Sequence, residues 1–253
     1  MDNDSSLTGF YAGLSGIQLP IPKYLYPSPF ETATRLTYYS SLFNSIEINS
    51  SFYKLPRPAT IEKWVGQVGN DFVFTFKLWK QVTHNPFLNF IPNDVQLFFD
   101  AIAPAHQKKG CVLIQFPPSC GIENKTQLKH LLRCINEVNI HSWNIAIEFR
   151  NQSWYEAEIF QLLEKSNAAL VVHDIPRSAT PLTDSDCDFV YIRFHGPTGN
   201  YRGSYPDTFL AEYAIYVKDW IGDNKKVYMY FNNTMGDAYH NLRKLQLEMA
   251  GTR

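Results

Sequence analysis

The sequence predicts an α/β fold, a single TIM-type (β/α)8 barrel, on three observations. Short apolar or alternating segments recur along the chain, helical patterns separate most of them, and 253 residues is the length of one such barrel. Strands that alternate with helices form a parallel sheet, and eight such units close into a barrel. We therefore expect one domain over residues 1–253, with residues 1–8 as a disordered or loosely packed tail.

Eight segments have the β-branched and aromatic composition of buried strands. They are FYAGL at 10, SIEIN at 45, FVFTFK at 72, CVLIQF at 111, NIAIEF at 144, ALVVHD at 169, FVYIRFH at 189 and VYMYFN at 227. Between most of them the apolar residues follow helical spacing, as Phe209, Tyr213, Val217 and Trp220 do before the last strand. The exception lies between Asp174 and Phe189, where Pro, Ser and Asp are too frequent for a regular helix, so we expect an irregular sixth crossover.

Two helix starts carry capping signals. Ser153 stands three residues before Glu156, which is the spacing of a capping box, and Asp207 precedes the apolar residues of the helix before the eighth strand. We therefore expect Ser153 to cap a helix rather than to act as a nucleophile.

Composition narrows the function classes. Lys plus Arg total 23 against 24 for Asp plus Glu, so the net charge is close to zero. The chain as a whole therefore has no electrostatic attraction to nucleic acid or to an anionic membrane. The N-terminus has no signal-peptide core and no segment is long enough to span a bilayer, which predicts a cytoplasmic protein without a membrane partner. The cysteines lack zinc-site spacing, and no motif indicates an organic cofactor. The oligomeric state stays open.

Charged and polar residues occupy the carboxyl ends of the predicted strands. Ile46 and Ile48 suit the helical layer, so strand alternation directs Glu47 and Asn49 into the barrel. On the sixth strand, alternation does not decide between His173 and Asp174. The same argument points further side chains inward, namely Lys77, Gln115, Glu148, Arg193, His195 and Asn232.

Such a ring of charges has two interpretations. A single buried charge can belong to a structural ion pair, for example Glu47 with Arg193 or with Lys77. A whole ring at one end instead indicates a wet cavity or a ligand, because each buried ion needs partners. The carboxyl end is also where barrel enzymes build their sites from loops, and His84 lies on one of these loops.

Seven ordered motifs resemble those of the domain of unknown function 72 family, also called YecE-like. The motifs are EINSSFY at 47, FTFK with VTH at 82, QFPPS at 115, EFRNQSW at 148, YIRFHG at 191, YRGSY at 201 and YFNN at 230. The similarity runs from about residue 9 to about residue 241. It implies a TIM-type barrel and no settled reaction, and its motif positions add Arg150, Tyr201, Tyr205 and Asn233 to the candidate site.

The chain departs from this family pattern at two positions. The family usually opens with a Gly-Thr-Ser-Gly-Trp-like run, whereas this chain has GLSGI at 13–17 and lacks the aromatic residue. After YFNN the family tends to have Gly-His-Ala, and Asp237 stands in the place of that histidine. The sequence leaves open whether these departures abolish an activity of the family.

Three functions remain open, and the leading one is an enzyme, an isomerase or a hydrolase. It acts on a phosphate- or carboxylate-bearing small molecule by general acid/base chemistry, and the loops after strands seven and eight are its expected phosphate site. The expected catalytic residues are Glu47, Glu148, Lys77 and His195. The expected substrate-binding residues are Asn49, His84, Gln115, Arg150, Asp174, Arg193, Tyr201, Tyr205, Asn232 and Asn233.

The two alternatives use overlapping residues. A metal-dependent phosphodiesterase or nuclease-like barrel would bind a divalent ion through Glu47, Glu148, Asp174 and His195. A non-catalytic barrel that binds nucleic acid or another ligand would stack bases on its aromatic and basic rim, which includes Tyr201, Arg202 and Tyr205.

Overall fold

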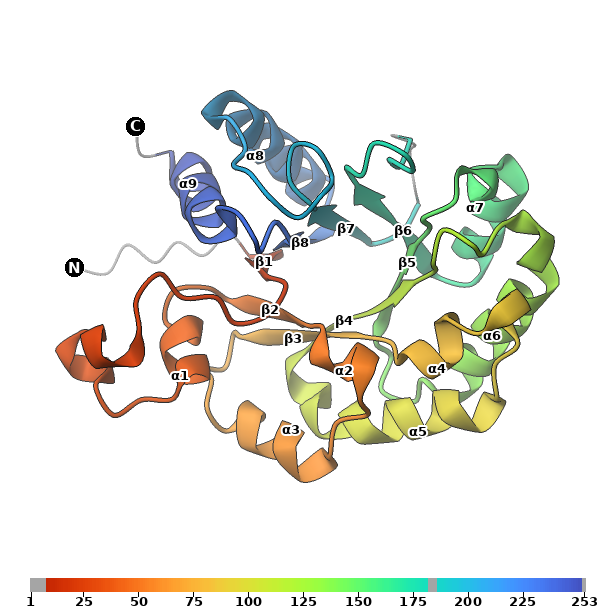
Figure 1. The fold of residues 1–253 in the computed structure, drawn as a ribbon, viewed down its shortest axis with the longest axis horizontal. Helices are drawn as coiled ribbons and strands as arrows, with labels where there is room; N and C mark the ends of the chain where they lie inside the picture. Colours follow the sequence, from red (N-terminus) through yellow and green to blue (C-terminus); the bar gives the residue numbers. More distant parts are fainter. Residues whose placement is uncertain (1–7, 182–185, 252–253) are drawn as a thin grey trace.

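The computed structural model describes residues 8–181 and 186–251, which form a barrel of eight parallel strands inside a ring of helices (Figure 1). The predicted tail lies outside the described residues except for Thr8. All eight predicted strands are confirmed: β1 Phe10–Leu14, β2 Ser45–Ile48, β3 Val73–Lys77, β4 Lys109–Gln115, β5 Asn144–Glu148, β6 Ala168–His173, β7 Phe189–Phe194 and β8 Lys226–Phe231.

The α-helices follow the strands in the predicted alternation. They are α1 Arg35–Ser40, α2 Ser50–Tyr53, α3 Pro58–Val65, α4 Lys80–Thr83, α5 Pro92–Ile102, α6 Lys125–Val138, α7 Ala157–Lys165, α8 Asp207–Gly222 and α9 Ala238–Ala250. Short 3-10 helices occupy Lys23–Leu25, Ser28–Phe30, Pro86–Leu88, Ala103–Lys108, Ile122–Asn124 and Gln152–Trp154. In α6 the residues at i, i+3, i+4 and i+7 are buried on one face, which is why this segment forms an amphipathic helix: Leu128, Leu131, Leu132 and Ile135.

The sixth crossover is irregular, as predicted. Residues 174–181 and 186–188, the described part of the connection between β6 and β7, contain no helix. In Figure 1 the described part of this connection is drawn as a loop between α7 and α8.

The two predicted helix caps are wrong. The Asn151 side chain accepts a hydrogen bond from the Ser153 backbone N–H at 3.0 Å, which starts a 3-10 turn before α7, and the Ser153 hydroxyl instead accepts from Ile122 N–H at 3.0 Å. Asp207 is the first residue of α8, and its carboxylate pairs with Lys244 at 3.1 Å rather than capping the helix.

The barrel is nearly closed, and side chains complete the junction between β1 and β2. The two strands share one isolated bridge, between Ser15 and Glu47. The Asn44 amide accepts from Ala12 N–H at 2.9 Å and donates to Phe10 O at 2.7 Å, so it replaces two backbone bonds of β1. Gly13 permits this approach, because an added Cβ would lie 2.1 Å from Ser45 O.

Tyrosine residues fill the barrel below the strand ends. Tyr191 and Tyr230 are fully buried, and the Tyr230 hydroxyl lies 2.6 Å from Ser45 Oγ and 2.7 Å from Thr75 Oγ1. A packed polar interior of this kind leaves the carboxyl ends of the strands as the place for a site. None of the described helices has the length and apolar character needed to cross a bilayer.

Candidate functional site

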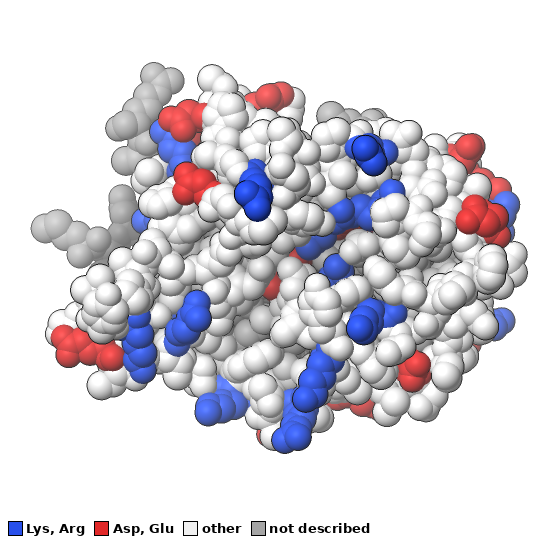
Figure 2. All heavy atoms as spheres, in the orientation of Figure 1, with Lys and Arg blue, Asp and Glu red and all other residues white. Residues whose placement is uncertain are grey.

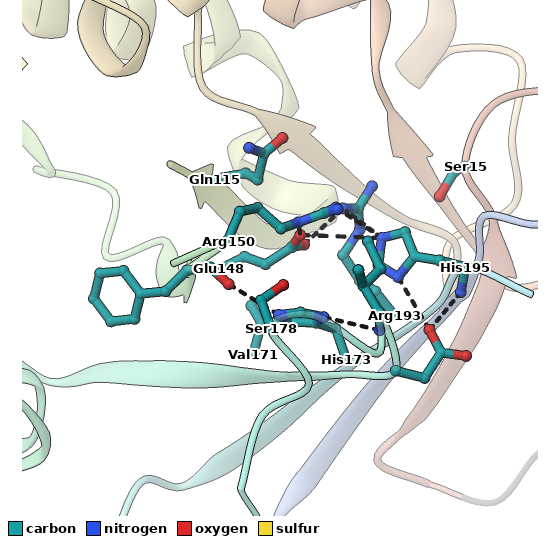
Figure 3. Close-up of polar contacts among 12 residues, drawn as sticks. Ser15, Gln115, Glu148, Arg150, Val171, His173, Ser178, Arg193 and His195 are labelled. Atoms are coloured by element: carbon teal, nitrogen blue, oxygen red, sulfur yellow. Dashed lines mark hydrogen bonds and ion pairs between the residues drawn. The ribbon is translucent and has the colours of Figure 1, made fainter. Parts of the chain in front are cut away.

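Arg193, on β7, joins two carboxylates that come from distant strands. Its Nε and Nη2 donate to the two oxygens of Glu47 on β2 at 2.9 and 2.7 Å, and its Nη1 donates to Glu148 Oε2 on β5 at 2.6 Å. All three side chains are at most 1% exposed. The predicted convergence of charged groups inside the barrel is therefore confirmed, and it takes the form of a buried ion triad (Figure 3 shows Arg193 and Glu148).

Both carboxylate oxygens of Glu47 accept hydrogen bonds. Besides the guanidinium of Arg193, it accepts from Ser15 Oγ at 2.7 Å and from the Tyr191 hydroxyl at 2.6 Å. Burial alone would raise the pKa of Glu47, but the charge and hydrogen bonds of Arg193 outweigh this effect and lower it. Glu47 therefore stays ionised and holds Arg193 in place.

Glu148 contacts a second arginine. Its Oε1 accepts from Arg150 Nε, while Oε2 accepts from Arg193. Burial would raise the pKa of Glu148, but the positive charges of Arg150 and Arg193 hold it well below its usual range. A carboxylate with so low a pKa is a weak base, and its main effect is to orient both guanidinium groups.

His195 and Asp174 form a pair beside the triad. Asp174 Oδ1 accepts from the His195 backbone N–H at 2.8 Å and faces its Nδ1 at 3.2 Å, which places the ring proton on Nδ1. The Nε2 atom then accepts from Arg150 Nη2 at 2.9 Å. Burial lowers the pKa of His195 to about 4, with the charge of Arg193 adding to the effect, so the imidazole is neutral near pH 7. Tyr205 donates to the other oxygen of Asp174 and fixes the pair.

Lys77, at the end of β3, differs from these groups because its contacts are neutral. Its Nζ donates to Gln115 Oε1 at 2.7 Å and lies 4.2 Å from the centre of the Phe52 ring. In the described part of the chain no carboxylate makes an ion pair with it. Burial of the ammonium lowers the pKa of Lys77 to about 8, and the nearby positive charge of Arg193 contributes.

These groups surround a cavity of about 170 Å³ at the carboxyl ends of the strands. Six predicted site residues line it: Asn49, Lys77, Arg150, Arg193, Tyr201 and Asn232. The Oδ1 atom of Asn49 is buried and has no hydrogen-bond partner among the described residues, which is unusual for a buried polar atom. Figure 2 shows a hollow near the middle of this face, with Lys and Arg atoms beside it and carboxylate atoms deeper inside.

Phe52 and Tyr53 also line the cavity, and sequence reasoning missed them as site residues. Both belong to α2, a helix of four residues that directly follows β2. Their position in the EINSSFY motif was the available signal, because α2 carries them from the end of β2 over the mouth of the barrel. The alternation of side chains between the two faces of a strand predicts no direction for residues that follow the strand, so it did not identify Phe52 and Tyr53.

Tyr201 has an uncommon backbone conformation. Its φ is +66°, which is disfavoured for an aromatic residue, and its N–H donates to His195 O at 2.7 Å. The Tyr201 ring meets the His195 ring edge-on, with 5.6 Å between centroids. The loop after β7 therefore holds this tyrosine against the polar cluster.

Other predicted residues support the cavity or lie away from it. Gln115 holds Lys77, and Asp174 holds His195. Tyr205 was expected to contact a ligand or to stack on bases, but it is 5% exposed and packs against Phe209 with 4.6 Å between ring centroids.

The remaining two predicted residues do not line the cavity. Asn233 is buried and donates to Gly203 O at 2.9 Å. His84 is exposed and contacts the outer part of the site through the Phe52 ring, 4.8 Å between centroids.

The loops after β7 and β8 use several amides internally. The N–H groups of Gly196, Gly199, Met235 and Gly236 donate to oxygen atoms of the protein itself. The positive lining of the cavity therefore comes from side chains rather than from these four backbone amides.

The four proposed metal ligands do not fit a divalent ion. Glu47 and Glu148 are both bound to Arg193, and Asp174 accepts from His195 and Tyr205. Over residues 8–181 and 186–251, no group of three or more His, Cys, Asp or Glu side chains is arranged to hold a metal.

Both departures from the family pattern lie in a second groove of about 530 Å³. Ile17, in the position of the missing aromatic, and Asp237, in the position of the histidine, line this groove together with Arg35 and His240. The lining residues of the first cavity do not include either position. The two substitutions therefore change one neighbouring surface and leave the cationic cavity intact.

Comparisons with known proteins agree on one family. Residues 11–253 match the family described as "Protein of unknown function DUF72". The UPF0759 protein YunF of Bacillus subtilis (strain 168) is 27% identical over 264 aligned positions, covering 90% of this chain and 92% of YunF. The UPF0759 protein YecE of Escherichia coli (strain K12) is 26% identical over 140 positions, covering 55% of this chain and 50% of YecE.

Two solved structures have the same fold. A DUF72 family protein from Enterococcus faecalis V583 superposes with a TM-score of 0.78 at 22% identity, covering 95% of each chain. A DUF72 family protein from Thermotoga maritima MSB8 superposes with a TM-score of 0.77 at 25% identity, covering 96% of this chain and 99% of the other.

Proposed function

Because this chain belongs to the DUF72 family, whose name assigns no activity, we propose its function from the site alone: it is an enzyme that binds a small anion and transfers protons on it by general acid/base chemistry. The observation that carries the proposal is the convergence of Lys77, Arg150 and Arg193 on one cavity. Guanidinium groups recognise carboxylate and phosphate through paired hydrogen bonds.

The cavity favours a small ligand. Its volume of about 170 Å³ is below the range of pockets for drug-sized molecules. Since a water molecule takes up roughly 30 Å³ in the liquid, the cavity has space for about six waters, or a similar number of non-hydrogen atoms. A three-carbon acid or a phosphate ion fits within this space, whereas a whole nucleotide would extend beyond it.

Two amides supply polar contacts beside the cations. The unpartnered Oδ1 of Asn49 accepts a hydrogen bond and is suited to a hydroxyl or another donor on the ligand. Asn232, the residue that follows β8, also lines the cavity. An anionic group on a ligand therefore meets the cations, and any hydrogen-bond donor on the ligand or on an intermediate formed from it meets the Asn49 oxygen.

Lys77 is the group best suited to move protons. Proton transfer is most efficient when the pKa of the group lies near the working pH, and burial brings the pKa of Lys77 to about 8. The pKa of Glu148 is held too low for an effective base by the same arginines that bind the anion. We therefore assign the two carboxylates and His195 to positioning and Lys77 to proton transfer.

Calorimetric titration tests the binding step. Lactate and inorganic phosphate should bind, whereas lactamide, a neutral molecule of the size of lactate, should not. Arg150→Met should weaken lactate binding about tenfold or more, because a charged hydrogen bond contributes about 1.5–3 kcal/mol. Arg133→Met, which removes an exposed arginine of α6, is the control and should bind as the wild type does. Equal binding of lactate and lactamide, or no loss in Arg150→Met, would refute the proposal.

A further inference from the structure

Lys77 is placed for covalent chemistry as well as for proton transfer. The amine lines a small cavity, its polar partner is the neutral amide of Gln115, and no described carboxylate pairs with it. A lysine next to other cations in a partly desolvated site is the usual setting of an amine that attacks carbonyl groups. The guanidinium groups of the neighbouring arginines are poor nucleophiles. Among the cationic groups that line the cavity, Lys77 Nζ is therefore the one suited to attack a carbonyl.

We propose that Lys77 forms an iminium (Schiff base) with the carbonyl carbon of a small oxo acid whose carboxylate or phosphate is bound by Arg150, with the charge of the buried Arg193 behind it. This inference rests on the proposed function, since it places the anion on the same arginines and narrows the substrate class to carbonyl compounds. The cavity has the volume of a three-carbon 2-oxo acid.

The step balances without another reagent. The ammonium first loses a proton. The neutral amine then adds to the carbonyl carbon, a C–N bond forms, the C=O π bond breaks, and a proton moves from nitrogen to oxygen to give a neutral carbinolamine. The hydroxyl takes up the proton that the ammonium lost, the C–O bond breaks, the oxygen leaves as water, and the nitrogen lone pair forms the C=N bond. Overall, the ammonium and the carbonyl give an iminium and one water, with the positive charge kept on nitrogen.

The surroundings of Lys77 favour this product. The Gln115 oxygen at 2.7 Å directs the nitrogen, and the Phe52 ring at 4.2 Å stabilises the cationic nitrogen before and after the reaction. An iminium withdraws electrons from the neighbouring carbon, so it makes the proton on that carbon easier to remove. While the iminium lasts, Lys77 cannot itself accept that proton, so the proton passes to solvent and Lys77 contributes through the covalent bond.

Trapping with sodium borohydride tests the proposal, with pyruvate as the probe. Reduction should leave a single pyruvate-derived secondary amine, detected by intact-protein mass spectrometry and placed on Lys77 by peptide mapping. Lactate, which lacks the carbonyl, should give no adduct. Lys77→Arg keeps the charge, removes the nucleophile and should abolish the adduct, whereas Lys80→Arg, at an exposed lysine three residues along, should not.

The pH dependence distinguishes Lys77 from an ordinary surface amine. Adduct formation requires the neutral amine, so its rate should rise with pH and level off near pH 8, where burial has brought the pKa of Lys77. Exposed lysines titrate about two units higher and would show a continued rise. A rate that keeps rising beyond pH 9, or labelling spread over exposed lysines, would overturn the proposal.

The failures of the two proposals are distinguishable. If calorimetry shows pyruvate bound in an Arg150-dependent manner and borohydride traps nothing, the covalent step is refuted and the anion site stands. If neither pyruvate, lactate nor phosphate binds, both proposals are refuted. An adduct that persists in Lys77→Arg refutes the role of Lys77, whatever the binding result.

Discussion

Arg193 and Glu47 form a side-on ion pair across the interior of the barrel, with Nε 2.9 Å from Oε2 and Nη2 2.7 Å from Oε1. The pair links β7 to β2, two strands that are not neighbours in the sheet. Both side chains are at most 1% exposed, so each depends on the other for compensation of its buried charge.

We expect Arg193→Met to destabilise the protein by about 3–5 kcal/mol, because it leaves Glu47 and Glu148 buried with one cationic partner fewer each. Urea unfolding followed by circular dichroism measures this loss. Lys125→Met is the matched control, since it breaks the exposed pair with Glu158 and should cost less than about 1 kcal/mol. Similar losses in the two variants would contradict the buried-triad interpretation.

A second substitution checks the cause of the loss. Adding Glu47→Gln to Arg193→Met removes the uncompensated charge, so the double variant should be more stable than Arg193→Met alone. Additive losses from the two changes would mean that the charges do not interact energetically.

The junction between β1 and β2 gives another prediction. Asn44→Ala should cost about 1–3 kcal/mol, because it leaves the N–H of Ala12 and the carbonyl of Phe10 without partners. Gly13→Ala should be at least as damaging, since the new Cβ would meet Ser45 O at 2.1 Å and force the strands apart. Thermal unfolding measures both. A Gly13→Ala protein as stable as the wild type would show that the strands separate at little cost.

This junction also shows which part of the fold could not be predicted from the sequence. The strands and the inward direction of Glu47, Lys77, Glu148 and Arg193 followed from alternation, because the period of a strand is two whatever its neighbours are. That Asn44 replaces backbone bonds did not follow, because it depends on how closely two strands approach.

The roles within the site were predictable only in part. Alternation placed Glu47 and Glu148 in the barrel, but both are bound by Arg193, a contact set by side-chain reach across the barrel. Tyr191 has the same parity as Arg193 on β7 and donates to Glu47, so alternation could have identified it. Phe52 lies on α2 beyond the strand end, where alternation gives no information.

The neutral His195 should make stability depend on pH. Its pKa is lowered by burial to about 4 in the folded state and is about 6.5 in the unfolded chain, so between these values the unfolded state binds more protons. Stability is therefore fully present above pH 6.5 and is lost as the pH falls toward 4. His195→Gln should make the free energy of unfolding depend less on pH. The effect of the histidine between pH 6.5 and pH 4 is at most about 3 kcal/mol.

Urea titrations at several pH values between 4 and 7 measure the slope. His240→Gln, at an exposed position on α9, is the control and should leave the slope as in the wild type. Below the histidine window, protonation of Glu47 and Glu148 should remove further stability, because their folded pKa values are lowered and the loss continues as the pH falls through them. An unchanged slope in His195→Gln would contradict the neutral, buried imidazole.

Proton transfer by Lys77 is testable without knowing the natural substrate. Exchange of the methyl hydrogens of pyruvate with deuterium from D2O, followed by NMR, reports proton removal beside a carbonyl. Lys77→Met should lower the protein-dependent exchange rate about 10²–10⁴-fold, the usual contribution of a positioned acid or base.

The fold should survive, since Lys77 has no carboxylate partner in the described structure and its removal leaves no buried charge uncompensated. The Lys80→Met protein should exchange the pyruvate hydrogens at the wild-type rate.

The wild-type exchange rate should rise with pH and level off near pH 8, because the neutral amine of Lys77 is the active form. A Lys77→Met protein that is folded and still exchanges at the wild-type rate would remove Lys77 from the mechanism, and proton transfer would then have to come from Glu148 or His195 despite their low pKa values.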